Sequence, residues 1–330
     1  MIILGIETTC DETAASLVRD GREILSNVIA SSADIHMKYG GVFPELACRR
    51  HIEAIIPVIE EAAAPIAYSK IDLIAVAKGP GLIGALLIGM QTAKGLSLAW
   101  NKPLIGVNHV EAHLYGAMMG APEPLLFPAL GIVLSGGHTF LAKILGVGQY
   151  ELLGTTVDDA IGEAFDKVGT LLNQPYPGGP RVEKLALKGN PKRFSFKAGK
   201  VKKNPLDFSF SGLKTSVYYA LRDRLIDDQE KADAAASFQE TAFSDIVSKA
   251  ALALSQFSCR AIYLGGGVCN NQRLRALFAQ SFSLLPIFWP PADLSLDNAA
   301  MIAGLGYHKF LHNPTGDPLD LDVKTRISIA

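Results

Sequence analysis

Short apolar runs open the chain, and the same arrangement returns further along. Three predicted strands come first, at residues 2–6, 14–18 and 23–30. A second set of three follows, at residues 129–134, 140–145 and 150–153. The polar turn 8–12 follows the first strand of the first set, and residues 135–139 take the same place in the second. This restart predicts a duplicated domain rather than a solenoid.

Apolar residues with helical spacing separate and follow these strands. We expect helices at residues 44–64, 82–100, 158–172, 213–226, 231–257 and 297–310. One more helix carries His109 and another opens near Asn271, whereas a Pro/Gly loop covers 173–180. Further strands are expected at 73–77, 104–107 and 261–264. The alternation favours an α/β fold with mixed sheets, and the opening meanders argue against a simple Rossmann domain.

Composition narrows the class of protein. The 330 residues are 49% hydrophobic, enough for a large core and for two domains. Lys and Arg number 31 against 32 Asp and Glu, so a nucleic-acid partner must meet a local basic patch. No signal peptide or membrane span is predicted. The four cysteines form no C-x-x-C pair, which fits a reducing, cytoplasmic location.

His109 and His113 are four residues apart and therefore share one face of the predicted helix. Such a pair can bind one metal ion, or be two polar residues without a ligand. It also looks like a zinc-protease helix, in which a Glu follows the first His directly. Here Glu111 is one residue later and points about 200° away from His109, so the protease interpretation weakens.

Three loops that follow apolar strands have a composition that lets backbone amides approach phosphate: residues 8–13, 135–139 and 265–271. A fourth loop, 79–84, matches G-x-G-x-x-G but lacks the acid expected about 20 residues later. We interpret its glycines as sites of close packing between helix and sheet. No Walker sequence is present, which excludes a P-loop nucleotidase.

Asp297 lies at the start of the last predicted helix and has two interpretations. It is either the N-cap carboxylate, which is the commoner role, or the third ligand of a site with two histidines and one carboxylate. The residues alone favour the cap.

Several motifs together resemble one protein family. They lie at residues 5–13, 36–47, 79–82, 108–113, 135–139, 164–167, 176–180, 210–215, 265–271 and 297–303. The family is the tRNA N(6)-adenosine threonylcarbamoyltransferases, formerly labelled O-sialoglycoprotein endopeptidases. Residues 158–166 resemble its bacterial or organellar branch.

The resemblance implies a duplicated actin-like fold of the sugar-kinase and heat-shock-ATPase type, with two lobes and a central cleft. We expect the N-terminal lobe at 1–125, with part of the helix near 300–330 packed on it. The C-terminal lobe would cover 126–330, with helical insertions and a basic loop at 188–203.

The resemblance also implies roles for individual residues. His109, His113 and Asp297 would hold one divalent metal ion, iron or zinc. Apart from the resemblance, Asp11 and Glu12 on the first loop are our candidates to orient or deprotonate the attacking amine, the alternative being an exposed turn whose two carboxylates are merely solvated. The adenylate of threonylcarbamoyl-AMP would be bound by Val133, Leu134, Ser135, Gly136, Gly137, Asp166, Gly179, Glu183 and Asn271.

The activity implied is acyl transfer from threonylcarbamoyl-AMP to the exocyclic amine of the adenosine beside the tRNA anticodon. The tRNAs would be those that read codons beginning with A. The resemblance implies two protein partners, an inactive paralogue and a small P-loop ATPase. An ATPase or ATP-dependent phosphotransferase of the same superfamily is the alternative, although such enzymes hold magnesium through carboxylates and phosphates and need no paired histidines.

A tRNA partner would need a basic surface. No acid occurs between Glu183 and Asp207, and the seven basic residues from Lys188 to Lys203 are interleaved with Phe194 and Phe196. This run could neutralise tRNA phosphates or be an ordinary solvated loop. The candidate tRNA contacts are Lys197, Lys200, Lys202 and Lys203.

Overall fold

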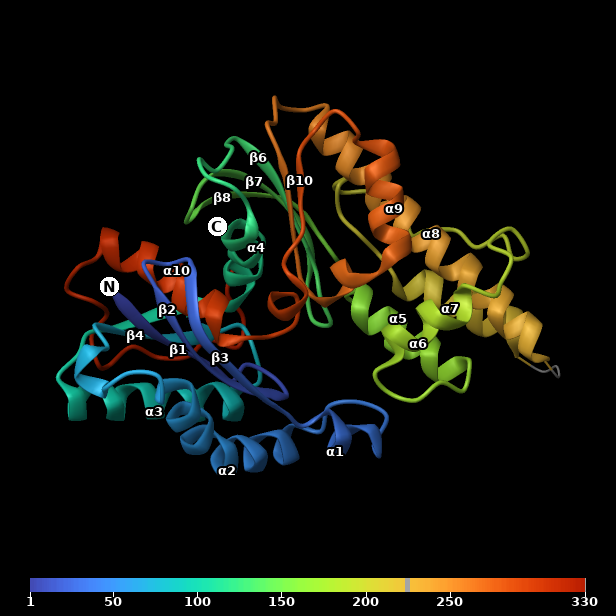
Figure 1. The fold of residues 1–330 in the computed structure, drawn as a ribbon. Helices are drawn as coiled ribbons and strands as arrows, with labels where there is room; N and C mark the ends of the chain where they lie inside the picture. The colour runs from blue at the N-terminus through green and yellow to red at the C-terminus, as the bar shows by residue number, and fades with distance from the viewer. Residues whose placement is uncertain (223–225, 330) are drawn as a thin grey trace. The chain divides into compact units, whose positions relative to one another are not determined.

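The computed structural model describes residues 1–222 and 226–329, which form two compact units (Figure 1). Unit 1 contains Met1–Leu125, Gly146–Tyr150 and Pro290–Ala330. Unit 2 contains Leu126–Leu145 and Glu151–Trp289. Among the described residues, no helix is both long and apolar enough to cross a membrane.

Unit 1 is built on a five-stranded mixed sheet in the order β3-β2-β1-β4-β5. Neighbours pair antiparallel from β1 to β3 and parallel from β1 through β4 to β5. The three strands of the opening meander are confirmed within a few residues. The bounds are β1 Ile2–Glu7, β2 Glu12–Arg19, β3 Glu23–Ser31, β4 Leu73–Gly79 and β5 Leu104–Asn108.

Helices cover both faces of this sheet, which explains why β1, β2 and β4 are buried almost throughout. Figure 1 shows α2 and α3 on one face and α10 on the other. The helices of unit 1 are α1 Ala33–Met37, α2 Pro44–Ala63, α3 Ile83–Trp100, α4 His109–Gly120 and α10 Ala299–His312, with short turns η1 Tyr68–Lys70 and η3 Ala292–Leu294.

Unit 2 repeats the pattern with a five-stranded sheet in the order β10-β9-β6-β7-β8. Its central strand β6 pairs antiparallel with β7 and parallel with β9, as β1 does with β2 and β4. The predicted duplication is therefore confirmed. The strands are β6 Ala129–Leu134, β7 Thr139–Gly146, β8 Gln149–Thr155, β9 Ile262–Gly265 and β10 Ile287–Phe288.

The helices of unit 2 pack around a core that includes Phe165, Phe238 and Phe243. They are α5 Ile161–Leu171, α6 Gly178–Ala186, α7 Ser211–Leu221, α8 Asp228–Leu254 and α9 Gln272–Ser281, with the short turn η2 Gly267–Asn270.

Several expectations need correction. The sequence missed α1 and the two-residue strand β10, because elements this short leave no clear periodicity. Helix α6 begins inside the expected loop 173–180, since its two N-terminal glycines resemble turn residues. The expected helix 213–226 crosses residues 223–225, which lie outside the described part of the chain.

Candidate metal centre and nucleotide-binding loops

Helix α4 starts directly where β5 ends, and this junction places both histidines. The side chain of Asn108 caps the helix, since its Oδ1 accepts a hydrogen bond from the Val110 amide at 2.9 Å. His109 and His113 are buried one turn apart, with ring centroids separated by 4.7 Å. The predicted shared face is confirmed.

Asp297 is not the helix cap that the sequence favoured. Helix α10 is capped by the next residue, Asn298, whose Oδ1 accepts from the Met301 amide at 3.0 Å. The Asp297 carboxylate instead faces α4. Its Oδ1 lies 3.2 Å from His113 Nε2 and 3.6 Å from His109 Nε2.

A fourth residue, Glu7 at the end of β1, supports this group from behind. Its Oε2 lies 2.8 Å from His109 Nδ1, and its Oε1 accepts from the Thr9 amide at 2.6 Å. Burial works to lower the pKa of His109, but the charges of Glu7 and Asp297 outweigh it and raise that pKa to about 9. The sequence offered only one sign that Glu7 is functional, its position as an acid at the end of a buried strand, and no role was predicted for it.

The three side chains fit a metal ion. One donor atom each from His109, His113 and Asp297 lies within 4.8 Å of the others. The Glu7 carboxylate engages His109 Nδ1, which directs Nε2 toward Asp297, a common arrangement behind metal-binding histidines. Both ring nitrogens of His113 are buried without a hydrogen-bond partner among the described residues, and its Nε2 faces Asp297 Oδ1, as a metal-binding nitrogen would. Two imidazoles and one carboxylate suit a divalent transition metal and leave positions open.

Glu111 does not join this group. Its Oε2 lies 3.0 Å from Lys309 Nζ on α10, so the predicted orientation away from the histidines is confirmed. No carboxylate on α4 is therefore placed to act on a water bound there, as a zinc protease of this type requires.

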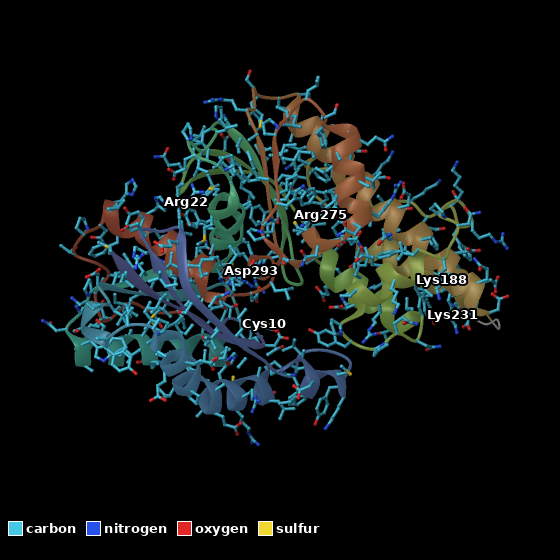
Figure 2. All side chains as sticks on the ribbon, in the orientation of Figure 1. Cys10, Arg22, Lys188, Lys231, Arg275 and Asp293 are labelled. Atoms are coloured by element: carbon cyan, nitrogen blue, oxygen red, sulfur yellow. The ribbon has the colours of Figure 1, made fainter. Side chains whose placement is uncertain are left out.

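Asp11 lies on the loop between β1 and β2, which Cys10 marks in Figure 2, and Glu12 is the first residue of β2. Burial, followed by the charges of Asp11 and Asp297, raises the pKa of Glu12 to about 9. The Cys10 thiol is also buried, and its pKa is raised with contributions from the same two acids. The charge of Asp297 thus acts on Cys10 and Glu12, so this part of the chain lies within electrostatic reach of the His109, His113 and Asp297 group.

In unit 2, the turn between β6 and β7 contains Ser135, Gly136 and Gly137. The Ser135 amide donates to the His138 carbonyl at 2.9 Å, and the Ser135 hydroxyl accepts from the His138 amide at 3.0 Å. A Cβ added at either glycine would meet no protein atom within 4 Å. The space beside this turn is therefore open to another molecule.

The other residues predicted to bind the adenylate lie on α5, on α6 and at the start of α9, and hydrogen bonds connect these helices. Asp166 on α5 accepts from the amides of Gly178 and Gly179, at 2.7 and 3.3 Å, and so caps α6. Farther along α6, Glu183 Oε1 accepts from the Gln272 amide at 2.7 Å, at the start of α9.

Asn271 completes the start of α9. Its Oδ1 accepts from the amides of Arg273 and Leu274, and its Nδ2 donates to Gln239 Oε1 at 2.8 Å. The loop that leads to Asn271 passes the turn after β6, because Gly266 lies against the Leu134 carbonyl. Sequence reasoning missed Gln239, which lies inside a long helix and carries no motif.

The loop 79–84 packs against protein, as predicted, but with different partners. A Cβ at Gly81 would lie 2.5 Å from the Thr9 carbonyl oxygen, and one at Gly84 would lie 2.4 Å from Cys48 Sγ. The glycines thus allow contacts with the loop after β1 and with α2, not with the sheet itself. No space for a dinucleotide remains at these two positions.

Comparison with known proteins assigns the family. A family model described as tRNA N6-adenosine threonylcarbamoyltransferase matches residues 23–304. A protein of that name from Protochlamydia amoebophila is 59% identical and aligns over 99% of this chain and 98% of its own. Another from Carboxydothermus hydrogenoformans is 47% identical over 97% of this chain and 96% of its own.

The chain belongs to the tRNA N6-adenosine threonylcarbamoyltransferase family. It is accordingly a transferase of tRNA modification, and the family resemblance of its motifs is confirmed.

Two solved structures share the fold at low identity. HypF from T. kodakarensis matches with a TM-score of 0.62 and 16% identity over 95% of this chain, which spans 48% of HypF. The activator of 2-hydroxyisocaproyl-CoA dehydratase from Clostridium difficile, solved with ADPNP, gives 0.53 and 12% over 95% of this chain and 97% of its own. These matches confirm the actin-like ATPase fold class.

The threonylcarbamoyltransferase family acts on tRNA, and the basic run between α6 and α7 is the segment that the sequence proposed for it. The segment begins at Lys188, labelled in Figure 2. Phe194 and Phe196 stack 5.5 Å apart and pack against the core of unit 2, so their rings are not a platform for bases. The exposed side chains of the segment include the basic residues Lys197, Lys200, Lys202 and Lys203.

Proposed function

We propose that this protein transfers the threonylcarbamoyl group of threonylcarbamoyl-AMP to the exocyclic amine of the adenosine next to the anticodon. The tRNAs are those that read codons beginning with A. The observation that carries the proposal is the convergence of His109, His113 and Asp297, with Glu7 behind His109, in a member of this family.

His109, His113 and Asp297 would hold one iron or zinc ion, since imidazole and carboxylate ligands suit both metals. When bound, the metal supplies a Lewis acid that polarises a carbonyl of the donor. The Glu7 carboxylate would accept a hydrogen bond from His109 Nδ1–H, which leaves His109 Nε2 unprotonated and able to bind the metal.

Unit 2 would hold the adenylate. Backbone groups of Val133, Leu134 and the turn Ser135–Gly137 would approach it, since the two glycines leave that space open. Gly179 lies at the N-terminal turn of α6, where a Cβ would also meet no protein atom. Asp166, Glu183 and Asn271 hold the two helix starts in place and would contact the ribose or base.

Asp11 and Glu12 are assigned to the attacking amine. One carboxylate would orient the amine and the other would accept its proton as the carbonyl carbon is attacked and AMP leaves. Because the pKa of Glu12 is raised to about 9, Glu12 would be protonated near neutral pH and would orient the amine, which leaves Asp11 to accept the proton.

The exposed lysines of the basic segment would contact tRNA phosphates. An inactive paralogue and a small P-loop ATPase would act as partners, in the cytoplasm. The four unpaired cysteines suit that compartment.

The test uses the purified full chain with threonylcarbamoyl-AMP and unmodified tRNA, with and without the two partner subunits. Nucleosides are then analysed by mass spectrometry. We expect threonylcarbamoyladenosine with the wild type and its loss with His109→Ala, whereas Glu60→Gln, an exposed change on α2, should retain activity. Absence of the modified nucleoside in every combination would refute the proposal.

A further inference from the structure

Helices α4 and α10 lie side by side in unit 1 and together deliver the metal ligands (Figure 1). His109 and His113 lie within α4, whereas Asp297 lies two residues before α10 begins. The distance between the histidine and carboxylate donors therefore depends on how α10 is set along α4.

Most of the contact between the two helices gives little directional information. Eight consecutive α10 residues from Ala299 to Gly306 are buried and are apolar or glycine. Gly304 allows a close approach, since a Cβ there would lie 2.6 Å from Tyr115 Cε1. Small and apolar faces fix a register through their shape alone, whereas polar contacts add specific partners that favour one register.

Two polar contacts join the helices. Glu111 Oε2 lies 3.0 Å from Lys309 Nζ, and Tyr115 Oη lies 2.7 Å from His308 Nε2. The Tyr115 hydroxyl also donates to the Gly21 carbonyl at 3.0 Å, so it accepts from His308. Glu111 and Tyr115 are one helical turn apart, and these contacts form two neighbouring rungs.

The ion pair between Glu111 and Lys309 should contribute little net free energy to folding. The Glu111 side chain is 11% exposed and that of Lys309 28% exposed, so both charges lose much of their hydration. Desolvation of such a pair offsets most of its attraction, and apolar residues of similar volume often do as well. What the pair supplies is a fixed position along the two helices.

A small shift would matter for the metal. A slip of α10 by one residue moves it by about 1.5 Å along its axis, and a slip of one turn by about 5.4 Å. Metal-binding groups need to be held to within about 0.5 Å. We propose that Glu111, through its ion pair with Lys309, is a positioning residue that sets α4 against α10 and holds His109 and His113 within reach of Asp297.

This inference rests on the proposed metal site, and Lys309→Met separates positioning from simple electrostatics. Met keeps most of the aliphatic stem but removes a positive charge from the neighbourhood of the cation. If charge alone mattered, the variant would bind Zn²⁺ more tightly than the wild type. Loss of positioning predicts the opposite, at least tenfold weaker binding.

The measurement is Zn²⁺ affinity of the full chain in competition with a chromogenic chelator. Glu111→Gln should also bind at least tenfold more weakly, and the double variant should bind no more weakly than the weaker single variant, because both changes break one contact. Lys309→Arg, which can keep the ion pair, should restore near wild-type affinity. The Co²⁺ absorption spectrum should change in Lys309→Met and not in Lys309→Arg.

A matched control comes from unit 2. Asp245 and Lys249 form a partly buried ion pair on α8, with side chains 15% and 11% exposed. Asp245→Asn with Lys249→Met should leave Zn²⁺ affinity unchanged, whatever the shift in melting temperature.

Equal or tighter binding by Lys309→Met, or a double variant with wild-type affinity, would overturn the inference. A wild type that binds Zn²⁺ normally while lacking transferase activity would count against the proposed function alone. A wild type that does not bind Zn²⁺ would remove the metal site and this inference with it.

Discussion

Glu7→Gln should weaken metal binding by changing which nitrogen of His109 carries the proton. The Glu7 carboxylate faces the Thr9 amide with Oε1 and His109 Nδ1 with Oε2. A backbone amide can only donate, so the glutamine oxygen must face Thr9 and its NH₂ group must face His109. Nδ1 would then accept, and the proton would move to Nε2, the nitrogen that faces Asp297. A protonated Nε2 cannot bind a metal.

Two opposing effects set the magnitude. Loss of a carboxylate behind a metal-binding histidine typically costs 10–100-fold in affinity, about 1.4–2.7 kcal/mol. In the opposite direction, the wild-type metal must displace a proton from His109, whose pKa is raised to about 9. At pH 7, about two pH units below that pKa, the competition lowers the affinity roughly a hundredfold, and at pH 8.5 only a few-fold. Removing the Glu7 charge lowers the pKa of His109 and relieves most of this cost.

The two effects should therefore nearly cancel at pH 7 and separate at pH 8.5. Zn²⁺ affinity is measured by chelator competition from pH 6.5 to 8.5. The wild type should gain affinity steeply as pH rises, whereas Glu7→Gln should respond weakly and bind several-fold to tens of times less tightly at pH 8.5. Glu60→Gln serves as the control, because this acid on α2 is exposed. Parallel pH curves with equal affinity at pH 8.5 would refute the reasoning.

Two further predictions concern the substrates. Gly179→Ala should leave the free energy of unfolding within about 0.5 kcal/mol of the wild type, because the added Cβ meets no protein atom. The same Cβ would occupy the space proposed for the adenylate, so AMP binding in a calorimetric titration should weaken. Gly81→Ala should instead lower the melting temperature by several degrees, since its Cβ meets the Thr9 carbonyl; equal melting of the two variants would contradict this. Alanine substitutions of Lys200, Lys202 and Lys203 should reduce the slope of log affinity for tRNA against log salt by about one unit per lysine. The affinity is measured by fluorescence anisotropy, and alanine at the exposed Lys70 serves as the control. An unchanged slope would remove this segment from the tRNA surface.

Local pattern was sufficient for much of the fold. The opening meander and its repeat were predictable because alternating and continuous apolar runs have few other solutions in a protein with this much core. Helices α2 and α3 began within a residue of their expected starts, since each follows a clear boundary, and a helix carries His109 as expected. The short elements α1 and β10 depend on neighbours for their stability and left no such pattern.

The candidate site was predictable only in part. Helical spacing placed His109 and His113 on one face and turned Glu111 away from it. Spacing could not decide the role of Asp297, because Asp and Asn are about equally good helix caps and two of them stand side by side. The structure decides it, since Asn298 takes the cap and Asp297 meets α4.

The sequence by itself determined the repeated strand order, the face that carries the histidines and, through its motifs, the family. These features depend on residue spacing and on runs of similar residues, which the chain carries locally. Only the tertiary structure decided that Glu7 supports His109 and that Lys309 pairs with Glu111. Those contacts join residues from separate strands and helices, and their distances depend on how whole elements pack. The spacing within one helix was thus enough to pair the two histidines, whereas Asp297, Glu7 and Lys309 reach them only because the surrounding elements pack as they do.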